Sequence, residues 1–185
     1  MILPIYTYGQ PVLREEAKSI DSGYPKIKEL ITNMFETMYN AEGVGLAAPQ
    51  IGLSIQLLVI DGDALSENYP ECEGLKRVMI NPEILEHSNE TISLEEGCLS
   101  FPGVHEKVTR AAKIQIKYMD ENFDEHEETI EGFAARIVQH ECEHLNGRVF
   151  IDNISPIRRQ LNKGKLNNLI KGGASCDYKT KPLNR

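Results

Sequence analysis

Apolar residues recur at helical spacing in two segments of the chain. Between residues 27 and 38 they lie three or four positions apart, directly after Pro25, a residue favoured at the start of a helix. Between residues 132 and 145 an apolar face at the same spacing continues into two histidines. A third helix is predicted from Ser155-Pro156, a favourable N-cap and first-turn pair, to about residue 173.

Strands are predicted between these helices. Residues 113–119 (KIQIKYM) alternate polar and apolar, as a half-buried strand does, and residues 127–131 are expected to pair with them across an acidic turn. Shorter apolar runs predict further strands at 55–60, 78–80, 84–85 and 91–94. We therefore expect an α+β fold in which antiparallel strands surround a central helix over 132–145, with a further helix near each end.

The remaining segments lack this periodicity. Two glycines and a proline between residues 43 and 50 predict a shaped loop, and residues 62–75 read as a surface excursion. The length of 185 residues suits one domain, which we expect over residues 1–173, followed by a flexible tail over residues 174–185.

Composition and charge limit the classes of function. Apolar residues make up 41% and charged residues 26%, which excludes general disorder. The longest clean apolar run, 57–60, is too short to span a membrane, and the N-terminus has no secretory pattern, so a cytoplasmic location is expected. The net charge of −8 argues against DNA binding by the whole chain. Residues 155–185, however, contain eight basic residues and one acid.

The strongest chemical signal is the sequence H-E-x-x-H at residues 140–144. On a helix His140 and His144 share a face, so both imidazoles can reach one metal ion. Glu141 is offset by about 100° and can reach water beside the metal rather than the metal. Two surface histidines on an ordinary amphipathic helix are the alternative, which the preceding apolar face disfavours.

A third metal ligand is needed. Zinc endopeptidases that share this motif take it downstream, but no glutamate follows Glu143, and Phe150 stands where metzincins have their third histidine. The ligand must therefore lie upstream or come from a cysteine: Cys72, Cys98, Cys176 or another histidine. Cys98 is the best candidate because it follows a glycine at the end of a predicted strand, where a thiolate can approach a metal closely.

Three motifs, in order, resemble the signatures of the peptide deformylase family. They are GVGLAAPQ at 43–50, EGCLS at 96–100 and QHECEHL at 139–145. The resemblance extends to residues 34–39 and 80–82 and covers the chain to about residue 171. It implies an enzyme that removes the N-formyl group from the initiator methionine of nascent bacterial polypeptides and releases formate.

The resemblance also implies the roles of individual residues. Cys98, His140 and His144 would hold a divalent metal and leave a fourth position for water, as a catalytic site requires. Glu141 would take the proton of that water and pass it to the departing amine.

Further residues would stabilise the reaction and bind its substrate. The Gln50 amide and the Leu99 backbone N–H would donate to the oxyanion, although Gln50 could instead cap a turn. Gly45 would let the substrate backbone approach closely. The methionine pocket would be lined by apolar residues such as Leu46, Phe133 and Ile137.

A Cys/His/His ligand set accepts Zn²⁺, Fe²⁺, Ni²⁺ or Co²⁺, and the resemblance favours Fe²⁺. The expected substrates are N-formylmethionyl peptides, and the basic residues of 155–185 could dock on the ribosome, although a solvated helix and tail is an equal alternative. Two residues depart from the common family pattern, Arg136 and His105, and both concern the pocket.

Two other functions stay open from the sequence. A zinc endopeptidase is disfavoured by the missing downstream ligand. A ribosome-associated binding module with a structural metal is disfavoured because a structural site normally closes all four positions, and only three good ligands are visible. Release of formate from a formylated peptide would separate these alternatives from a deformylase.

Overall fold

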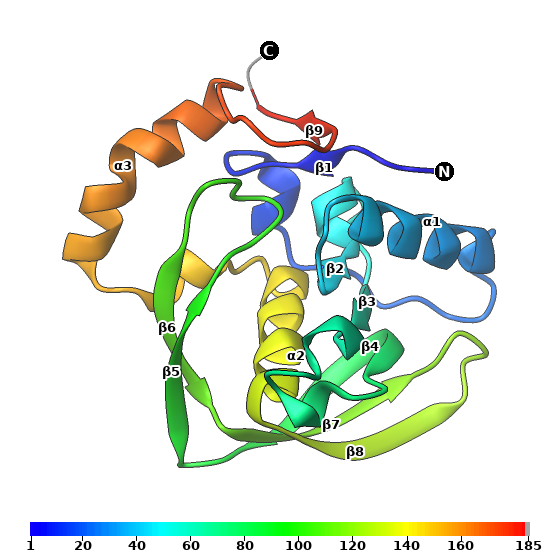
Figure 1. The fold of residues 1–185 in the computed structure, drawn as a ribbon. Helices are drawn as coiled ribbons and strands as arrows, with labels where there is room; N and C mark the ends of the chain where they lie inside the picture. The colour runs from blue at the N-terminus through cyan, green and yellow to red at the C-terminus, as the bar shows by residue number, and fades with distance from the viewer. Residues whose placement is uncertain (184–185) are drawn as a thin grey trace.

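A computed structural model describes residues 1–183, and Figure 1 shows an α+β fold in which antiparallel strands surround a central helix. The main sheet has the order β2-β3-β4-β7-β8, a second sheet pairs β5 with β6, and a third pairs β1 with β9 in parallel. The strands are β1 (Ile5–Tyr6), β2 (Gly45–Ala47), β3 (Leu57–Asp61), β4 (Lys76–His87), β5 (Thr91–Glu96), β6 (Glu106–Ala111), β7 (Lys113–Met119), β8 (Glu125–Glu131) and β9 (Thr180–Lys181). The helices are α1 (Ile27–Asn40), α2 (Gly132–Leu145) and α3 (Pro156–Ile170), with single 3₁₀ turns that include η2 (Ala48–Ile51), η4 (Pro70–Cys72) and η5 (Phe150–Asn153).

The main sheet is covered on both faces, which explains the unbroken apolar run of β3. Leu58 and Ile60 pack in the core that includes α2, whereas Leu57 and Val59 pack in the core that includes α1. Because neighbouring side chains of a strand point to opposite faces, a strand buried on both faces carries no polar positions. Helix α2 is thereby held in the middle of the molecule, between the main sheet and β6.

A third core cluster joins α3 to the β5–β6 side of the molecule. Phe101 and Phe150 meet edge to face with ring centroids 5.3 Å apart, and Leu166 and Leu169 of α3 pack in the same cluster. This cluster fixes the chain that follows β5, because Phe101 lies only a few residues beyond the end of that strand.

The predicted helices and the β7–β8 hairpin are confirmed, but β6 could not be predicted from apolar alternation. Its inward positions are Glu106, Val108 and Arg110, so two of three buried positions are charged. Strand β4 runs through Asn81-Pro82 instead of stopping there. Asn81 takes a left-handed conformation with φ 48°, and the register with β7 shifts beyond Ile80.

The excursion over residues 62–75 supports the central helix. The Glu71 carboxylate accepts a 2.7 Å hydrogen bond from the Phe133 N–H, in the first turn of α2. Tyr69 stacks on the Phe133 ring with centroids 4.2 Å apart. A carboxylate at a helix N-terminus satisfies a free N–H and meets the positive end of the helix dipole.

The segment after residue 173, which the sequence predicted as a flexible tail, contains a short strand and contacts the N-terminal segment. Strand β9 pairs with β1, and the Gln10 side chain donates to the carbonyls of Lys181 and Pro182. These contacts are between backbone and polar groups, which leave no apolar pattern in the sequence. The part of that prediction that concerns residues 184–185 lies outside the described residues. Within residues 1–183, no helix has the length and apolar character needed to cross a membrane.

Candidate metal centre

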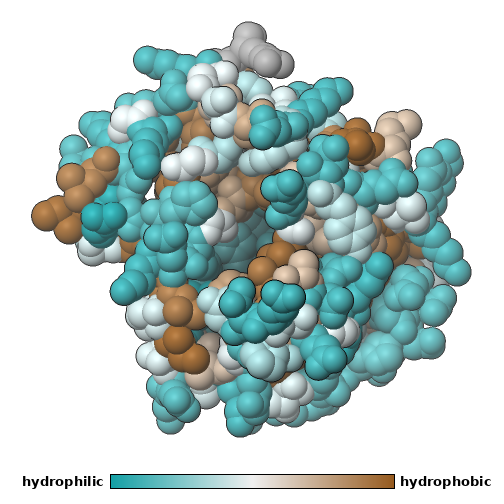
Figure 2. Space-filling view, viewed as in Figure 1, coloured by the Kyte–Doolittle hydropathy of each residue, from teal (hydrophilic) through white to brown (hydrophobic). Residues whose placement is uncertain are grey.

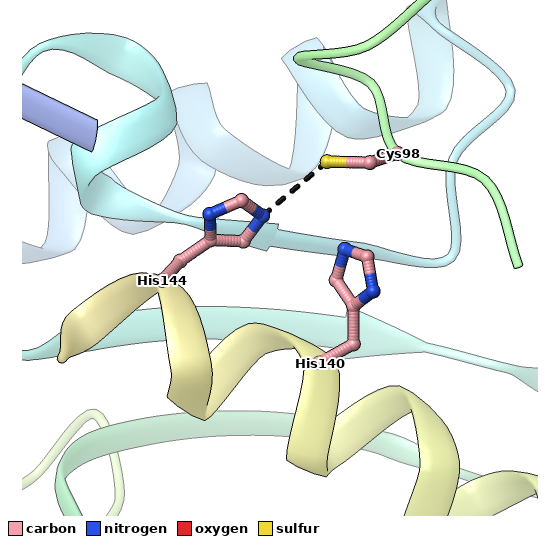
Figure 3. Close-up of side chains that lie close together, drawn as sticks. All are labelled: Cys98, His140 and His144. Atoms are coloured by element: carbon pink, nitrogen blue, oxygen red, sulfur yellow. Dashed lines mark hydrogen bonds between the residues drawn. The ribbon is translucent and has the colours of Figure 1, made fainter. Parts of the chain in front are cut away.

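Helix α2 directs both histidines of the motif to one point. His140 and His144 lie one turn apart on the buried face of the helix, and their side chains meet the Cys98 thiol, which comes from the chain just after β5 (Figure 3). One ligand atom from each of the three lies within 4.8 Å of the other two. Of the four candidates for the third ligand, the structure brings Cys98 to the histidines.

The spacing of these atoms fits a metal ion. The Cys98 Sγ lies 3.3 Å from the His144 Nε2. Tetrahedral coordination by one sulfur and two nitrogens separates the ligand atoms by roughly 3.4–3.6 Å. Burial keeps the pKa of His144 well below its ordinary value, so the ring is neutral, as a ligand must be. The donor set and its spacing therefore suit one divalent ion.

Glu96, the last residue of β5, orients His140. Its Oε1 lies 2.9 Å from the His140 Nδ1. Burial raises the pKa of Glu96, but hydrogen bonds with His140 and Arg110 outweigh burial and bring the pKa to about 2. Because this ionised carboxylate can only accept, His140 donates to it from Nδ1, and Nε2 is the ring nitrogen left to face the metal position.

Two buried arginines hold Glu96 in turn. Arg110 of β6 donates from Nε and Nη2 to the two carboxylate oxygens at 2.6 and 2.9 Å. It also contacts Glu143 of α2, which accepts from the Asn153 amide at 2.9 Å. This network was not found from the sequence, because its members are far apart along the chain and isolated charges carry no motif.

The second of these arginines is Arg136, one of the two residues expected to depart from the common family pattern. It donates to Glu96 and, at 2.8 Å, to the Val108 carbonyl, and it is 3% exposed. Arg136 thus joins α2 to β6 as part of the cavity wall. His105, the other departure, is exposed on the cavity wall beside Gly97.

The side chain of Glu141 is buried beside the proposed ligands. It is 5% exposed, and its Oε2 has no hydrogen-bond partner among the described residues. Burial raises its pKa to about 7. A buried carboxylate without a partner is costly unless a group outside the chain binds it, which suits a site for water.

The missing side chain of Gly45 makes room for Glu141. A Cβ at Gly45 would lie 2.5 Å from the Glu141 Oε1 and 2.8 Å from its Cγ. The sequence-based expectation was that this glycine lets the substrate approach. The structure adds a second requirement, because the carboxylate occupies the space of the absent methyl group.

Gln50 of η2 uses the two ends of its side chain differently. Its Oε1 accepts a 2.8 Å hydrogen bond from the Ala47 N–H, which is the turn-capping alternative. Its Nε2 lies 3.5 Å from the Cys98 Sγ and 3.3 Å from the Ser100 Oγ. The cap therefore fixes which end of the amide faces the centre. Leu99, next to Cys98, has a backbone N–H without an acceptor among the described residues.

A cavity of about 560 Å³ opens over these groups. Figure 2 shows the corresponding hollow near the middle of the molecular face, between the end of the β5–β6 hairpin and α1. Phe133, Ile137 and Gly45, three of the residues expected to bind the substrate, line the cavity. Leu46 does not, because its side chain is fully buried in the core with α1, on the opposite face of β2.

Comparisons with known proteins agree with this geometry. The sequence profile of the family described as polypeptide deformylase matches residues 2–160. The chain is 48% identical to a peptide deformylase of Christiangramia forsetii, over 97% of this chain and 95% of the relative. A peptide deformylase of Flavobacterium psychrophilum is 45% identical over 98% of this chain and 97% of its own length.

Solved structures are similar over the same range. The structure of peptide deformylase 1B of Arabidopsis thaliana superposes with a TM-score of 0.82 at 35% identity, and covers 92% of this chain and 91% of its own. That of Thermotoga maritima gives 0.76 at 43% identity, with 84% of this chain and 99% of its own covered. The chain therefore belongs to the peptide deformylase family, the metal-dependent hydrolases that remove the N-formyl group from nascent polypeptides.

Proposed function

We propose that Cys98, His140 and His144 hold one divalent metal ion at which this chain hydrolyses the N-formyl group of N-formylmethionyl peptides. The observation that carries the proposal is that one thiol and two imidazoles converge in a cavity beside Glu141, a buried carboxylate whose Oε2 has no hydrogen-bond partner in the described part of the chain. When bound, the metal supplies a Lewis acid that lowers the pKa of water towards neutrality and polarises the formyl oxygen.

Glu141 acts as the general base and then as the general acid. Its carboxylate takes a proton from the attacking water and passes it to the nitrogen of the departing amine. The formyl C–N bond breaks, and formate and a free methionyl amine leave. No group of residues 1–183 donates to the Glu141 Oε2, which supports this role because no described neighbour competes with water for that oxygen.

Gln50 and Leu99 stabilise the charge that develops on the formyl oxygen. The Gln50 Nε2 and the Leu99 N–H donate to it, and each such donor is worth about 2.7–4 kcal/mol in acyl-transfer sites. The fixed amide end of Gln50 and the unused N–H of Leu99 support these roles. Phe133 and Ile137 contribute apolar surface to the pocket for the methionine side chain.

A deformylation assay tests this function. Metal-loaded protein is mixed with formyl-Met-Ala-Ser, and formate and the new amine are measured. We expect equal amounts of both and no cleavage within the peptide. Cleavage of internal peptide bonds would instead support a zinc endopeptidase, and absence of any product from fully loaded protein would support a binding module.

We propose Fe²⁺ as the native metal. Mixed sulfur and nitrogen ligands accept iron, and the Cys98 side chain is only partly buried in an open cavity. Air would then inactivate the enzyme, because Fe²⁺ and the Cys98 thiolate both oxidise. Protein purified without oxygen should contain iron and be much faster than its zinc form, while a nickel form survives air. A zinc form as fast as the iron form would contradict this assignment.

We also propose that α3 docks the enzyme on the ribosome in the bacterial cytoplasm. Ile157 and Leu161 are 70% and 68% exposed on α3, and Figure 2 shows the apolar group that they form at the rim of the molecule. Arg159 and Lys163 lie on the same helix, with no acid in ion-pair distance among residues 1–183. The basic and the apolar side chains lie on different sides of α3, and the basic side suits an RNA surface while the apolar side suits an adjoining protein.

Salt-dependent co-sedimentation with ribosomes tests this docking. The double variant Arg159→Ser/Lys163→Ser should weaken it, whereas Arg158 must be kept, because it pairs with the buried Glu106 at 2.8 Å and holds α3 on the body. A matched control changes Lys113 and Lys117, which lie on β7. Co-sedimentation that is unchanged by the α3 double variant, or insensitive to salt, would contradict the proposal.

A further inference from the structure

We propose that Tyr178 is a positioning residue for deformylation, which holds the peptide of Leu99 in place from the C-terminal segment. This inference rests on the proposed role of the Leu99 N–H as a donor to the developing oxyanion. Its basis is that the Tyr178 hydroxyl donates a 2.8 Å hydrogen bond to the Leu99 carbonyl. Tyr178 lies beyond residue 160, where the match to the family profile ends.

The segment that carries Tyr178 forms part of the active-site cavity. After α3 the chain turns back at Gly172 and Gly173, and residues 175–178 line the same cavity as Gly45 and Glu141. It then continues into β9, beside β1 (Figure 1). The C-terminal segment is therefore a wall of the reaction site.

Backbone hydrogen bonds anchor this wall directly after Tyr178. The Ile5 N–H donates to the Lys179 carbonyl at 2.9 Å, and the Thr7 N–H donates to the Lys181 carbonyl at 3.2 Å. The Lys181 ammonium also donates to the Tyr6 hydroxyl at 3.1 Å. Because these bonds begin one residue after Tyr178, the side chain is carried on a fixed strand rather than on a free end.

The loop 98–100 follows β5 and lies at the cavity. Each of its three carbonyl groups accepts a hydrogen bond. The Cys98 carbonyl accepts from the Phe101 N–H at 2.8 Å, within the loop itself. The Ser100 carbonyl accepts from the Tyr8 N–H at 2.9 Å, from the N-terminal arm. The Leu99 carbonyl accepts from Tyr178, its one protein donor among the described residues.

Strands β1 and β9 pair with each other, and the segments beside them hold the loop 98–100. This loop carries Cys98, a proposed metal ligand, and the Leu99 N–H, a proposed oxyanion donor. If the Leu99 carbonyl is released, the Leu99–Ser100 peptide can rotate, and the adjoining Cys98–Leu99 peptide, which carries the Leu99 N–H, loses a fixed neighbour that helps to set its direction. A donor that is aimed before the reaction stabilises the transition state without reorganisation, whereas a loose donor must be ordered during it. Ground-state binding of the peptide uses other groups, so the loss should appear in kcat rather than in KM.

Tyr178→Phe tests this inference, because it removes the hydroxyl and keeps the ring. We expect kcat to fall roughly 3- to 10-fold, the effect of one lost hydrogen bond, with KM within about twofold and metal content unchanged. Hydrogen exchange of the peptide that contains Leu99 and Phe101 should become faster. The matched control is Tyr6→Phe, which removes a hydroxyl bonded to the same segment but not to the loop, and it should change neither quantity.

A variant Tyr178→Phe with the kcat and exchange rate of the wild type would overturn the inference. So would a rise in KM alone, which would make Tyr178 a substrate contact, or equal losses in Tyr178→Phe and Tyr6→Phe, which would indicate general loosening of β9. A wild type that released no formate would refute the proposed function, and the exchange measurement would still decide whether Tyr178 holds the loop.

Discussion

One methyl group added at Gly45 should displace the proposed general base. The new Cβ of Gly45→Ala would lie 2.5 Å from the Glu141 Oε1 and 2.9 Å from its Cδ, whereas ordinary contacts begin at 3.4 Å. Neither the backbone of Gly45 nor that of Glu141 can shift easily to relieve this contact. Gly45 pairs with Ile60 in the main sheet, and Glu141 lies on the buried face of α2. The carboxylate therefore has to move by about 1 Å.

The size of the effect follows from this displacement. Misplacing a reacting group by about 1 Å can cost about 100-fold in rate, which is about 2.7 kcal/mol of transition-state stabilisation. Removing a general base altogether costs about 10²- to 10⁴-fold. We expect Gly45→Ala to lower kcat by roughly 30- to 100-fold and the free energy of unfolding by about 1–3 kcal/mol, the usual cost of overpacking.

Formate release from formyl-Met-Ala-Ser, at matched metal content, measures the loss. Gly164→Ala is the control: nothing lies within 4 Å of its new Cβ in α3, so kcat should stay unchanged while stability rises by about 1 kcal/mol. The double variant Gly45→Ala/Glu141→Ala should be no slower than Glu141→Ala, because the methyl group acts through that carboxylate. If the two substitutions lowered kcat independently, so that the double variant was slower than Glu141→Ala, this reasoning would be refuted. A rise in KM alone in Gly45→Ala would also refute it and would make Gly45 a substrate contact.

Other predictions concern the oxyanion, the helix start and pH. Gln50→Leu should lower kcat by roughly 100-fold with unchanged metal content in kinetic and metal assays, and an unchanged kcat would leave Gln50 a turn cap only. Glu71→Ala should lower the free energy of unfolding by about 1 kcal/mol in denaturant titrations, because the Phe133 N–H loses its acceptor, and equal midpoints would contradict this. The hydrogen bond from Arg158 lowers the pKa of Glu106. The ionised Glu106 therefore stabilises the fold at pH values above the ordinary glutamate pKa, and this stabilisation is lost as the pH falls through the lowered pKa. In Glu106→Gln the melting temperature should fall less steeply at acid pH than in the wild type.

The sequence was sufficient where chemistry and periodicity coincide. His140, Glu141 and His144 fall on a strongly periodic helix, so their shared face could be predicted from spacing alone. Cys98 was chosen as third ligand from its position after a predicted strand, and the structure brings its thiol to the histidines. The α+β class followed from the same helices and the β7–β8 hairpin.

Other features depend on pairing between distant segments. Leu46 was expected to line the pocket as one of its apolar residues, within a segment expected to be a loop. Leu46 is instead part of β2, and its side chain points to the core behind the site. Strand β6 could not be predicted, because the charged residues Glu106 and Arg110 occupy two of its inward positions and break the apolar alternation. Tyr178 lies in a polar segment that backbone bonds to β1 hold, and such bonds have no signature in side-chain pattern.

The central claim is that Glu141 moves the proton while Cys98, His140 and His144 hold the metal. Glu141→Ala separates the two functions: metal analysis and formate release are measured on the same anaerobically prepared sample. The account predicts one metal ion per chain, as in the wild type, and a loss of about 10²- to 10⁴-fold in kcat. A variant that keeps more than about a tenth of the wild-type kcat, or that loses its metal along with its activity, would contradict it.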